Sequence, residues 1–118
     1  MRIKISGRKA GVLCNILREF CADQQHFLDT ESYWWAGADR RMVRAQLRRA
    51  EKLIAQLEMK HVLSRREVDV LLGLLAEFCA DQEHFLAEEL FSDDNERRRT
   101  LRQLQLAQRL AGWLRRRL

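Results

Sequence analysis

Acidic residues and a histidine form a stripe that occurs twice in this chain, and these side chains are the best suited to bind a metal ion. In the first copy, four and three positions separate Glu19, Asp23 and His26, so in a helix they lie along one side. The second copy, 58 positions downstream, consists of Glu77, Asp81 and His84. Inward carboxylates with a histidine three residues after one of them hold pairs of iron or manganese ions in four-helix bundles. A metal-binding bundle is therefore one hypothesis.

Other features of the stripe argue against a metal site. On a helical wheel it flanks the apolar face by about a quarter turn and does not occupy the centre of that face. The helices expected after each copy carry mainly arginine and show no matching inward acids, whereas metal-binding bundles draw ligands from all four helices. The sequence therefore predicts no metal ligand and no cofactor. We interpret the stripe as a polar rim, or as a contact surface for the arginines of a neighbouring helix.

The stripe belongs to a longer repeated segment. Residues 19–28 read EFCADQQHFL and residues 77–86 read EFCADQEHFL, and the match spreads outward on both sides. The chain is therefore a tandem duplication, with one unit over 6–62 and its copy over 64–118. Each unit is expected to bury its apolar face on the other, so that residues 1–118 form a single domain.

Composition and helix-start signals predict an all-α fold. The chain has no proline, five glycines and 33% charged residues, which favours long helices. Four helices are expected, beginning at Ser6, Asp39, Ser64 and Asp93. Ser64 with Glu67, and Asp93 with Glu96, match the capping box, and the first helix is expected to end near Gly37. Short connections make successive helices antiparallel, so we predict an up-down-up-down four-helix bundle built from two helical hairpins.

Apolar periodicity predicts what the helices bury. The seam of the fourth helix is predicted to be Leu101, Leu104, Ala107, Ala111, Leu114 and Leu118. Gln24 and Gln82 fall near the middle of the apolar stripes, so we expect them to contact each other near a two-fold axis. The cysteines are expected to be reduced core residues, and they are Cys14, Cys21 and Cys79. Strand-like alternation occurs only over 2–5, which is too short to found a sheet.

The fourth helix carries more apolar surface than one seam requires. Leu106, Leu110 and Trp113 are spaced by four and three positions, away from the predicted seam. A second aromatic cluster, where the first repeat departs from the second, consists of Tyr33, Trp34 and Trp35. Broad core-facing stripes are common in helices, and a tryptophan can cover the end of a bundle. An exposed apolar patch rimmed by arginine, with tryptophan as its anchor, instead indicates a protein-binding surface.

Positive charge concentrates on the second and fourth helices. The formal net charge is +5, and the basic stripes that carry it are Arg41, Arg44, Arg48 and Lys52 on the second helix and Arg98, Arg102, Arg109 and Arg116 on the fourth. Such stripes are suited to binding nucleic acid, because arginine contacts phosphate and releases counterions. They can equally pair with acids of the neighbouring helices. The sequence contains no RNA-binding motif, glycine-rich phosphate loop or zinc finger.

These patterns predict a small non-enzymatic helical binding protein, such as an adaptor, inhibitor, chaperone or assembly subunit. No nucleophile–base pair or glycine-rich loop offers a catalytic site, and no small-molecule substrate is indicated. The expected partner is another protein or a second copy of the chain. The alternative is a nucleic-acid-binding subunit of a nucleoprotein complex, and a metal-binding bundle is a more distant alternative. With no apolar run of membrane-spanning length and no secretory signal, a cytoplasmic location is expected.

Overall fold

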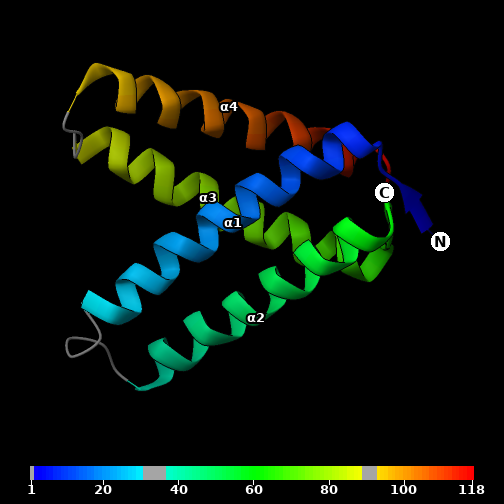
Figure 1. The fold of residues 1–118 in the computed structure, drawn as a ribbon, viewed down its shortest axis with the longest axis horizontal. Coiled ribbons are helices and arrows are strands. Elements are labelled where there is room, and N and C mark those ends of the chain that lie inside the picture. Colours follow the sequence, from blue (N-terminus) through cyan, green and yellow to red (C-terminus); the bar gives the residue numbers. More distant parts are fainter. Residues whose placement is uncertain (1, 31–36, 89–92) are drawn as a thin grey trace.

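The computed structural model describes residues 2–30, 37–88 and 93–118, which fold into four long helices (Figure 1). The helices are α1 (Gly7–Thr30), α2 (Gly37–Met59), α3 (Arg65–Glu88) and α4 (Asp94–Arg115). Two short strands, β1 (Arg2–Lys4) and β2 (Val62–Ser64), precede α1 and α3. The predicted four-helix bundle of two hairpins is confirmed.

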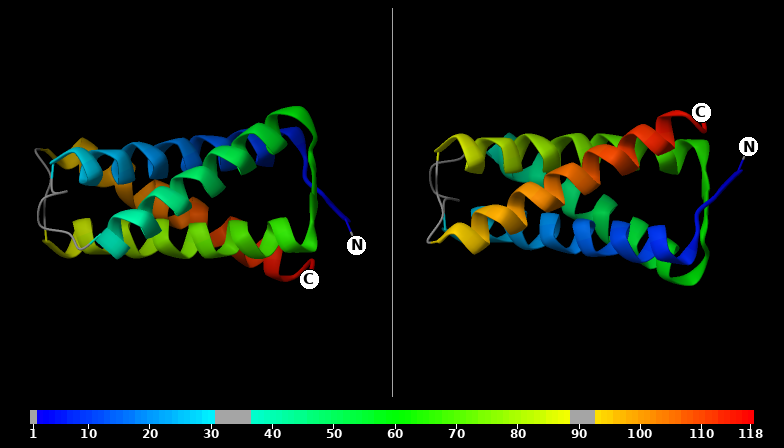
Figure 2. Two further views of the ribbon diagram at one scale, coloured as in Figure 1. Left: turned by 90° about the horizontal axis from the view of Figure 1, so that it is seen from below. Right: turned by 90° about the horizontal axis from the view of Figure 1, so that it is seen from above.

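Each repeat folds as an antiparallel hairpin, with α1 packed on α2 and α3 packed on α4. The hairpins also touch each other, since α4 contacts α1 and α2 contacts α3. Figure 1 shows the hairpins held together at the end that carries the strands and diverging toward the opposite end. The two views in Figure 2 place α2 across one side of the molecule and α4 across the other. Each hairpin therefore covers part of the other hairpin's apolar face.

A two-stranded antiparallel ribbon joins the repeats at one end, so the prediction that the alternation over 2–5 founds no sheet is wrong. Ile3 pairs with Leu63, and Lys4 pairs with Val62. The Ile5 N–H continues the ladder by donating to the carbonyl oxygen of His61 at 2.7 Å. Two strands of three residues are enough to form this ribbon because each repeat supplies one of them. Ile3 and Leu63 also anchor the ribbon, since both are buried in the core.

Three of the predicted helix starts are visible as hydrogen bonds. At α1, Lys9 N–H donates to Ser6 Oγ at 3.2 Å. At α3, Glu67 N–H donates to Ser64 Oγ at 3.2 Å, and Ser64 N–H donates to Glu67 Oε1 at 2.8 Å. This is the complete capping box. At α4, Glu96 N–H donates to Asp93 Oδ1 at 2.8 Å. The predicted end of the first helix lies outside the described residues, and Gly37 is the first residue of α2.

The main core is a cluster of apolar side chains from all six elements, and it reaches the repeated segment at its two phenylalanines. Phe20 and Phe78, which are equivalent in the two repeats, are each 1% exposed. A smaller cluster consists of Leu28, Val43 and Leu47, all within the first hairpin. The main core therefore joins both hairpins to the ribbon, whereas the smaller cluster packs within its own hairpin.

The predicted seam of α4 is wrong at two positions. Leu101 and Leu118 are 44% and 41% exposed, whereas Thr100 and Leu110 are buried. The buried positions of α2 and α4 match at a spacing of 57, as in Val43 and Thr100. Since α1 and α3 match at a spacing of 58, the connection between the two helices is one residue shorter in the second repeat than in the first. One residue turns a helix by about 100°, which carries Leu101 out of the core.

Candidate functional site

A shallow surface groove between α4 and the start of α1 brings together the apolar residues that the sequence singled out, and it is the candidate binding site. Its volume is about 500 Å³, and it is lined by Lys9, Leu106, Gln108, Arg109, Leu110, Gly112, Trp113 and Arg116. Leu106 is 39% exposed, Leu110 is buried in the floor, and Trp113 packs partly against the core. The three apolar residues that the sequence singled out on the fourth helix therefore lie together. None of the described residues that line this groove is acidic.

Two cations cover the indole of Trp113. Lys9 Nζ lies 4.8 Å from the ring centroid, and Arg117 Cζ lies 4.5 Å from it. Such cation–π contacts contribute about 0.5–1 kcal/mol each at exposed sites. Lys9 comes from the first turn of α1 and Arg117 from just beyond the end of α4. The ring therefore links the two repeats at the surface as well as in the core.

The duplication places an equivalent groove between α2 and α3, and its chemistry differs. This second groove has a volume of about 520 Å³ and is lined by Arg49, Lys52, Leu53, Gln56, Arg66, Glu67 and Val70. At the spacing of 57, Arg49 corresponds to Leu106 and Gln56 to Trp113. At the spacing of 58, Glu67 corresponds to Lys9. The two grooves therefore occupy equivalent places and differ in chemistry. The α4/α1 groove has an apolar strip and only basic charges, whereas the α2/α3 groove has polar residues in place of that strip and carries both charges.

The remaining aromatic residues of the predicted protein-binding surface cannot be placed beside the groove. Tyr33, Trp34 and Trp35 lie outside the described residues. The candidate site consequently rests on the α4 residues and on the cations around them. Among those cations, Lys9 and Arg117 were not singled out in the sequence. The signal for Lys9 was its equivalence to Glu67, because a lysine at a glutamate position marks a divergence between repeats.

All eight residues of the predicted basic stripes are exposed on α2 and α4. Arg44 and Arg48, with Arg40, line a shallow depression of about 270 Å³ that also contains Asp29 and Glu51. The ion pairs within the described part of the chain join Arg18 to Glu58 and Arg99 to Glu19. Neither pair includes a member of the stripes, so the stripe residues are not consumed by ion pairing with described acids.

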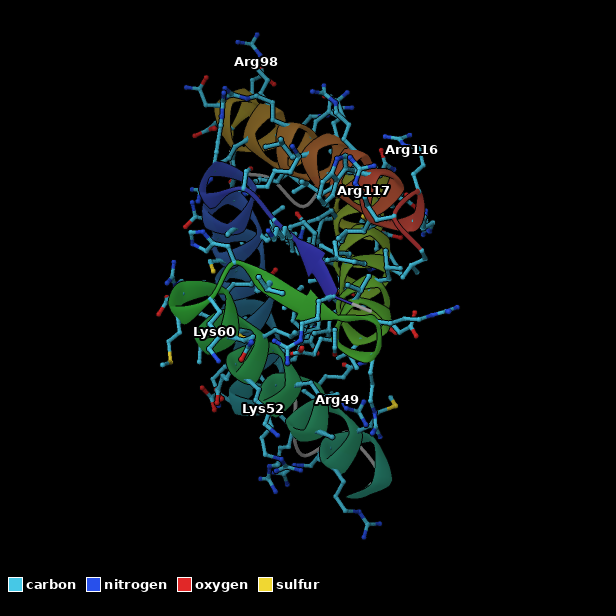
Figure 3. The ribbon with its side chains drawn as sticks, turned by 90° about the vertical axis from the view of Figure 1, so that its right-hand side faces the viewer. Arg49, Lys52, Lys60, Arg98, Arg116 and Arg117 are labelled. Carbon is cyan, nitrogen blue, oxygen red and sulfur yellow. The ribbon has the colours of Figure 1, made fainter. Side chains whose placement is uncertain are left out.

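Cations also surround the ribbon end of the molecule. Residues 2–12 carry four cations and no acid, and residues 112–118 carry three arginines and no acid. Figure 3 looks at this end and shows Lys60 and Arg117, which are equivalent at the spacing of 57, on opposite sides of the ribbon. The N-termini of α1 and α3 and the C-termini of α2 and α4 all lie here, so their helix dipoles largely offset one another and the side chains supply the positive charge. The ribbon end is therefore a basic surface distinct from the groove floor.

The acid–acid–histidine stripe serves contacts between the hairpins. Glu19 accepts a hydrogen bond from Gln103 of α4, and Arg99 of the same helix lies 3.8 Å away. This agrees with the interpretation of the stripe as a contact surface for a basic helix. Two more carboxylates of the stripe, Asp23 and Asp81, lie at the crossing of α1 and α3, where each repeat meets its copy, and the fourth, Glu77, is exposed.

The buried glutamines bond to these aspartates, so the predicted contact between Gln24 and Gln82 is replaced by a reciprocal arrangement. Gln24 Nε2 donates to Asp81 Oδ2 at 3.2 Å, and Gln82 hydrogen-bonds to Asp23. Burial raises the pKa of Asp81 to about 6, with the charges of Glu77 and Asp23 adding to the effect. Burial and Glu19 likewise raise the pKa of Asp23. The side-chain amides of Gln24 and Gln82 thus supply hydrogen-bond donors to two half-buried carboxyl groups that would otherwise lack a partner.

The stripe does not assemble a metal site within the described residues. No group of three or more histidine, cysteine, aspartate or glutamate side chains there is placed to hold a metal ion. His26 and His84 are both exposed, and the His84 ring lies at a tilt to Phe85 with centroids 6.2 Å apart. Three members of the stripe, Glu19, Asp23 and Asp81, contact other helices of the bundle.

The three cysteines are free thiols. Cys14 is buried, and Cys21 and Cys79 pack partly against the core. Burial raises the pKa of each thiol, which keeps it protonated and weakly nucleophilic. These residues fill the core, as the sequence predicts.

Comparison of the chain with protein-family models, with curated proteins and with solved structures gives no match. Among the helices in the described residues, none combines the length and the apolar character needed to span a membrane. The chain's own surfaces, and the differences between its two repeats, are therefore what indicate its function.

Proposed function

We propose that this protein is a small non-enzymatic binding protein, an adaptor, inhibitor, chaperone or assembly subunit, that engages another protein through the α4/α1 groove. The observation that carries the proposal is the divergence of the two equivalent grooves. Leu106 and Trp113 lie at the positions that Arg49 and Gln56 occupy in the other repeat. The α4/α1 groove therefore has apolar side chains where the equivalent groove has polar ones. A partly exposed tryptophan and leucine with an arginine rim have the composition of interface hot spots.

A photo-crosslinking experiment in the native host tests this proposal. A photoreactive amino acid placed at Leu106 should capture one or a few defined proteins, because that side chain lies at the groove mouth. The matched control places the same group at Arg49, in the equivalent groove. Absence of protein adducts at position 106, or the same adducts at both positions, would contradict the proposal. The free thiols support a reducing compartment such as the cytoplasm as the place to look.

The second candidate function is nucleic-acid binding through the basic faces of α2 and α4. The observation that favours it is that the stripe residues are exposed and are not paired with described acids. A protein that contacts several phosphates loses affinity steeply as salt rises. Fluorescence anisotropy with single-stranded RNA and duplex DNA, over a series of salt concentrations, measures that slope. Reversing Arg44 and Arg48 to glutamate should then lower both the affinity and the slope, and reversing Arg98 and Arg102 should do the same for α4. Unchanged binding in both variants would exclude these faces.

A further inference from the structure

We propose that the α4/α1 groove binds an acidic amphipathic helix of the partner protein, an inference that rests on the proposed function and names the chemistry of its ligand. The groove's apolar strip runs along α4 from Leu106 to Trp113, a distance of about 10 Å at 1.5 Å per residue. That length matches two turns of a helix laid into the groove. A helical ligand presents apolar side chains at such spacings along one face.

Charge complementarity determines what must flank that apolar face. Cations line the groove from both sides, with Lys9 on α1 and Arg109 and Arg116 on α4. Because the lining residues include no acid, a partner with basic flanks would place like charges together, whereas aspartate or glutamate flanks would pair with them. A second copy of the chain is a poorer occupant, since two such grooves brought face to face repel. The net charge of +5 opposes self-association in the same way.

The contacts of Trp113 allow the groove to accept such a ligand at low cost. Lys9 and Arg117 lie over the ring, and neither is fixed there by an ion pair with a described residue. Long cationic side chains with weak surface contacts move readily when a carboxylate offers a stronger partner. An acidic helix would therefore draw these cations to its flanks and open the indole to an apolar side chain.

Differences in the equivalent α2/α3 groove explain why only the α4/α1 groove is suited to an acidic helix. There, Glu67 occupies the position of Lys9 and bonds to the Ser64 backbone in the capping box. Its carboxylate lines that groove and would repel an acidic ligand. Gln56, at the position of Trp113, donates to the carbonyl oxygen of Val62 at 3.5 Å. The α2/α3 groove thus lacks both the apolar anchor and the uniform charge.

The duplication also provides substitutions that the fold already tolerates at equivalent positions. Leu106→Arg gives the α4/α1 groove the residue of the other repeat at its exposed mouth. Lys9→Glu does the same at the rim and adds the carboxylate that completes a capping box with Ser6. Arg49→Leu is the matched control in the second groove. Thermal unfolding of each variant should stay close to that of the wild type.

The test measures binding of three fluorescent 18-residue probe helices that share one leucine face and differ in their flanks. The flanks are glutamate, glutamine or lysine. The wild type should bind the glutamate probe at least tenfold more tightly than the lysine probe, with the difference shrinking at high salt. Leu106→Arg should weaken the glutamate probe about tenfold, whereas Arg49→Leu should change it less than twofold. The double variant Lys9→Glu with Arg109→Glu should abolish or reverse the preference.

The outcomes separate this inference from the proposed function. Equal binding of all three probes, still sensitive to Leu106→Arg, would overturn the acidic preference and leave a protein-binding groove. No binding of any probe would overturn the helix proposal, and crosslinking at position 106 would decide the proposed function independently. A concentration-dependent dimer that Leu106→Arg dissociates would identify a second copy as the occupant and would also overturn the proposal.

Discussion

Lys4 of β1 pairs directly with Val62 of β2, and these two residues occupy equivalent positions in the two repeats. A pseudo-two-fold axis therefore passes between them. The same operation interchanges the two glutamine–aspartate contacts at the crossing of α1 and α3. Each repeat thus contacts the other through its own copy of one surface, as the subunits of a symmetric dimer do. The chain has the architecture of such a dimer fused into one polypeptide, and its function is expected where the symmetry is broken.

The ribbon makes a measurable contribution to stability through one face only. Replacing Ile3 by alanine should lower the free energy of unfolding by about 2–3 kcal/mol, because its buried side chain leaves a cavity beneath the strand. Lys4→Ala, on the exposed face, should change it by less than about 0.5 kcal/mol. Urea unfolding monitored by circular dichroism measures both. Equal effects of the two substitutions would mean that the strand does not pack as described.

The two central phenylalanines should respond alike to substitution. Phe20→Leu and Phe78→Leu each remove part of a side chain that is 1% exposed, so each should destabilise the protein by about 1–1.5 kcal/mol. Their equivalence under the two-fold axis predicts values that agree within about 0.5 kcal/mol. Met59→Ala, at a side chain 82% exposed, is the control and should be nearly neutral. A difference above about 1 kcal/mol between the phenylalanine variants would show that the repeats pack unequally.

Lys9 and Glu67 occupy equivalent positions in the first turns of α1 and α3, and giving each the other's residue should have unequal effects on stability. Glu67→Lys removes a hydrogen bond to Ser64 N–H and places a cation at a helix N-terminus, so it should cost about 1–2 kcal/mol. Lys9→Glu loses one cation–π contact but gains the favourable helix-dipole interaction, so its cost should stay within about 0.5 kcal/mol. Thermal and urea unfolding of both variants check this asymmetry. Equal losses would indicate that Lys9 stabilises α1 in another way.

The sequence predicted the helices and most of the core because the repeat and its periodicity are local signals. The apolar residues that recur at helical spacing in α1, such as Leu13, Leu17 and Phe20, are buried. The error at Leu101 arose because apolar spacing favours a leucine over the neighbouring polar Thr100, which is the residue that α4 buries. Aligning the second helices by their small core residues, Ala50 and Ala107, would have revealed it. The helix-start signals at Ser6, Ser64 and Asp93 succeeded for the same local reason, whereas α2 begins at Gly37, two residues before the predicted Asp39.

The ribbon and the glutamine contacts required knowledge of how the two copies meet. A two-fold axis perpendicular to a strand places the equivalent strand of the other repeat beside it in the antiparallel direction. The segment before Ser64 therefore pairs with the segment before Ser6. The same axis lets helices cross with an offset of one residue, which brings Gln24 to Asp81 instead of Gln82. The groove was predicted only in part. Leu106, Leu110 and Trp113 came from spacing, whereas Lys9 arrives from the other end of the chain through tertiary structure alone.

The carboxyl groups at the helix crossing should make stability depend on pH. The pKa of Asp81 is raised from its ordinary value of 3.8 to about 6, chiefly by burial. Because the native state holds this proton more tightly than the unfolded chain, the contribution to stability is fully present below about pH 4. It is lost as the pH rises through about 6. Around neutral pH, Asp81 is therefore ionised at some cost to the folded state.

Asp81→Asn removes that cost and keeps an oxygen to accept the Gln24 hydrogen bond. We expect the variant to be about 1 kcal/mol more stable than the wild type at pH 7, a value reduced for the solvent that reaches this half-buried site. The advantage should fade toward pH 4, where the wild-type carboxyl is protonated. Asp23→Asn should act in the same direction, because it also removes a charge that raises the pKa of Asp81. Urea unfolding at several pH values measures these differences, and a variant that is less stable at pH 7 would show that the ionised carboxylate supports the crossing.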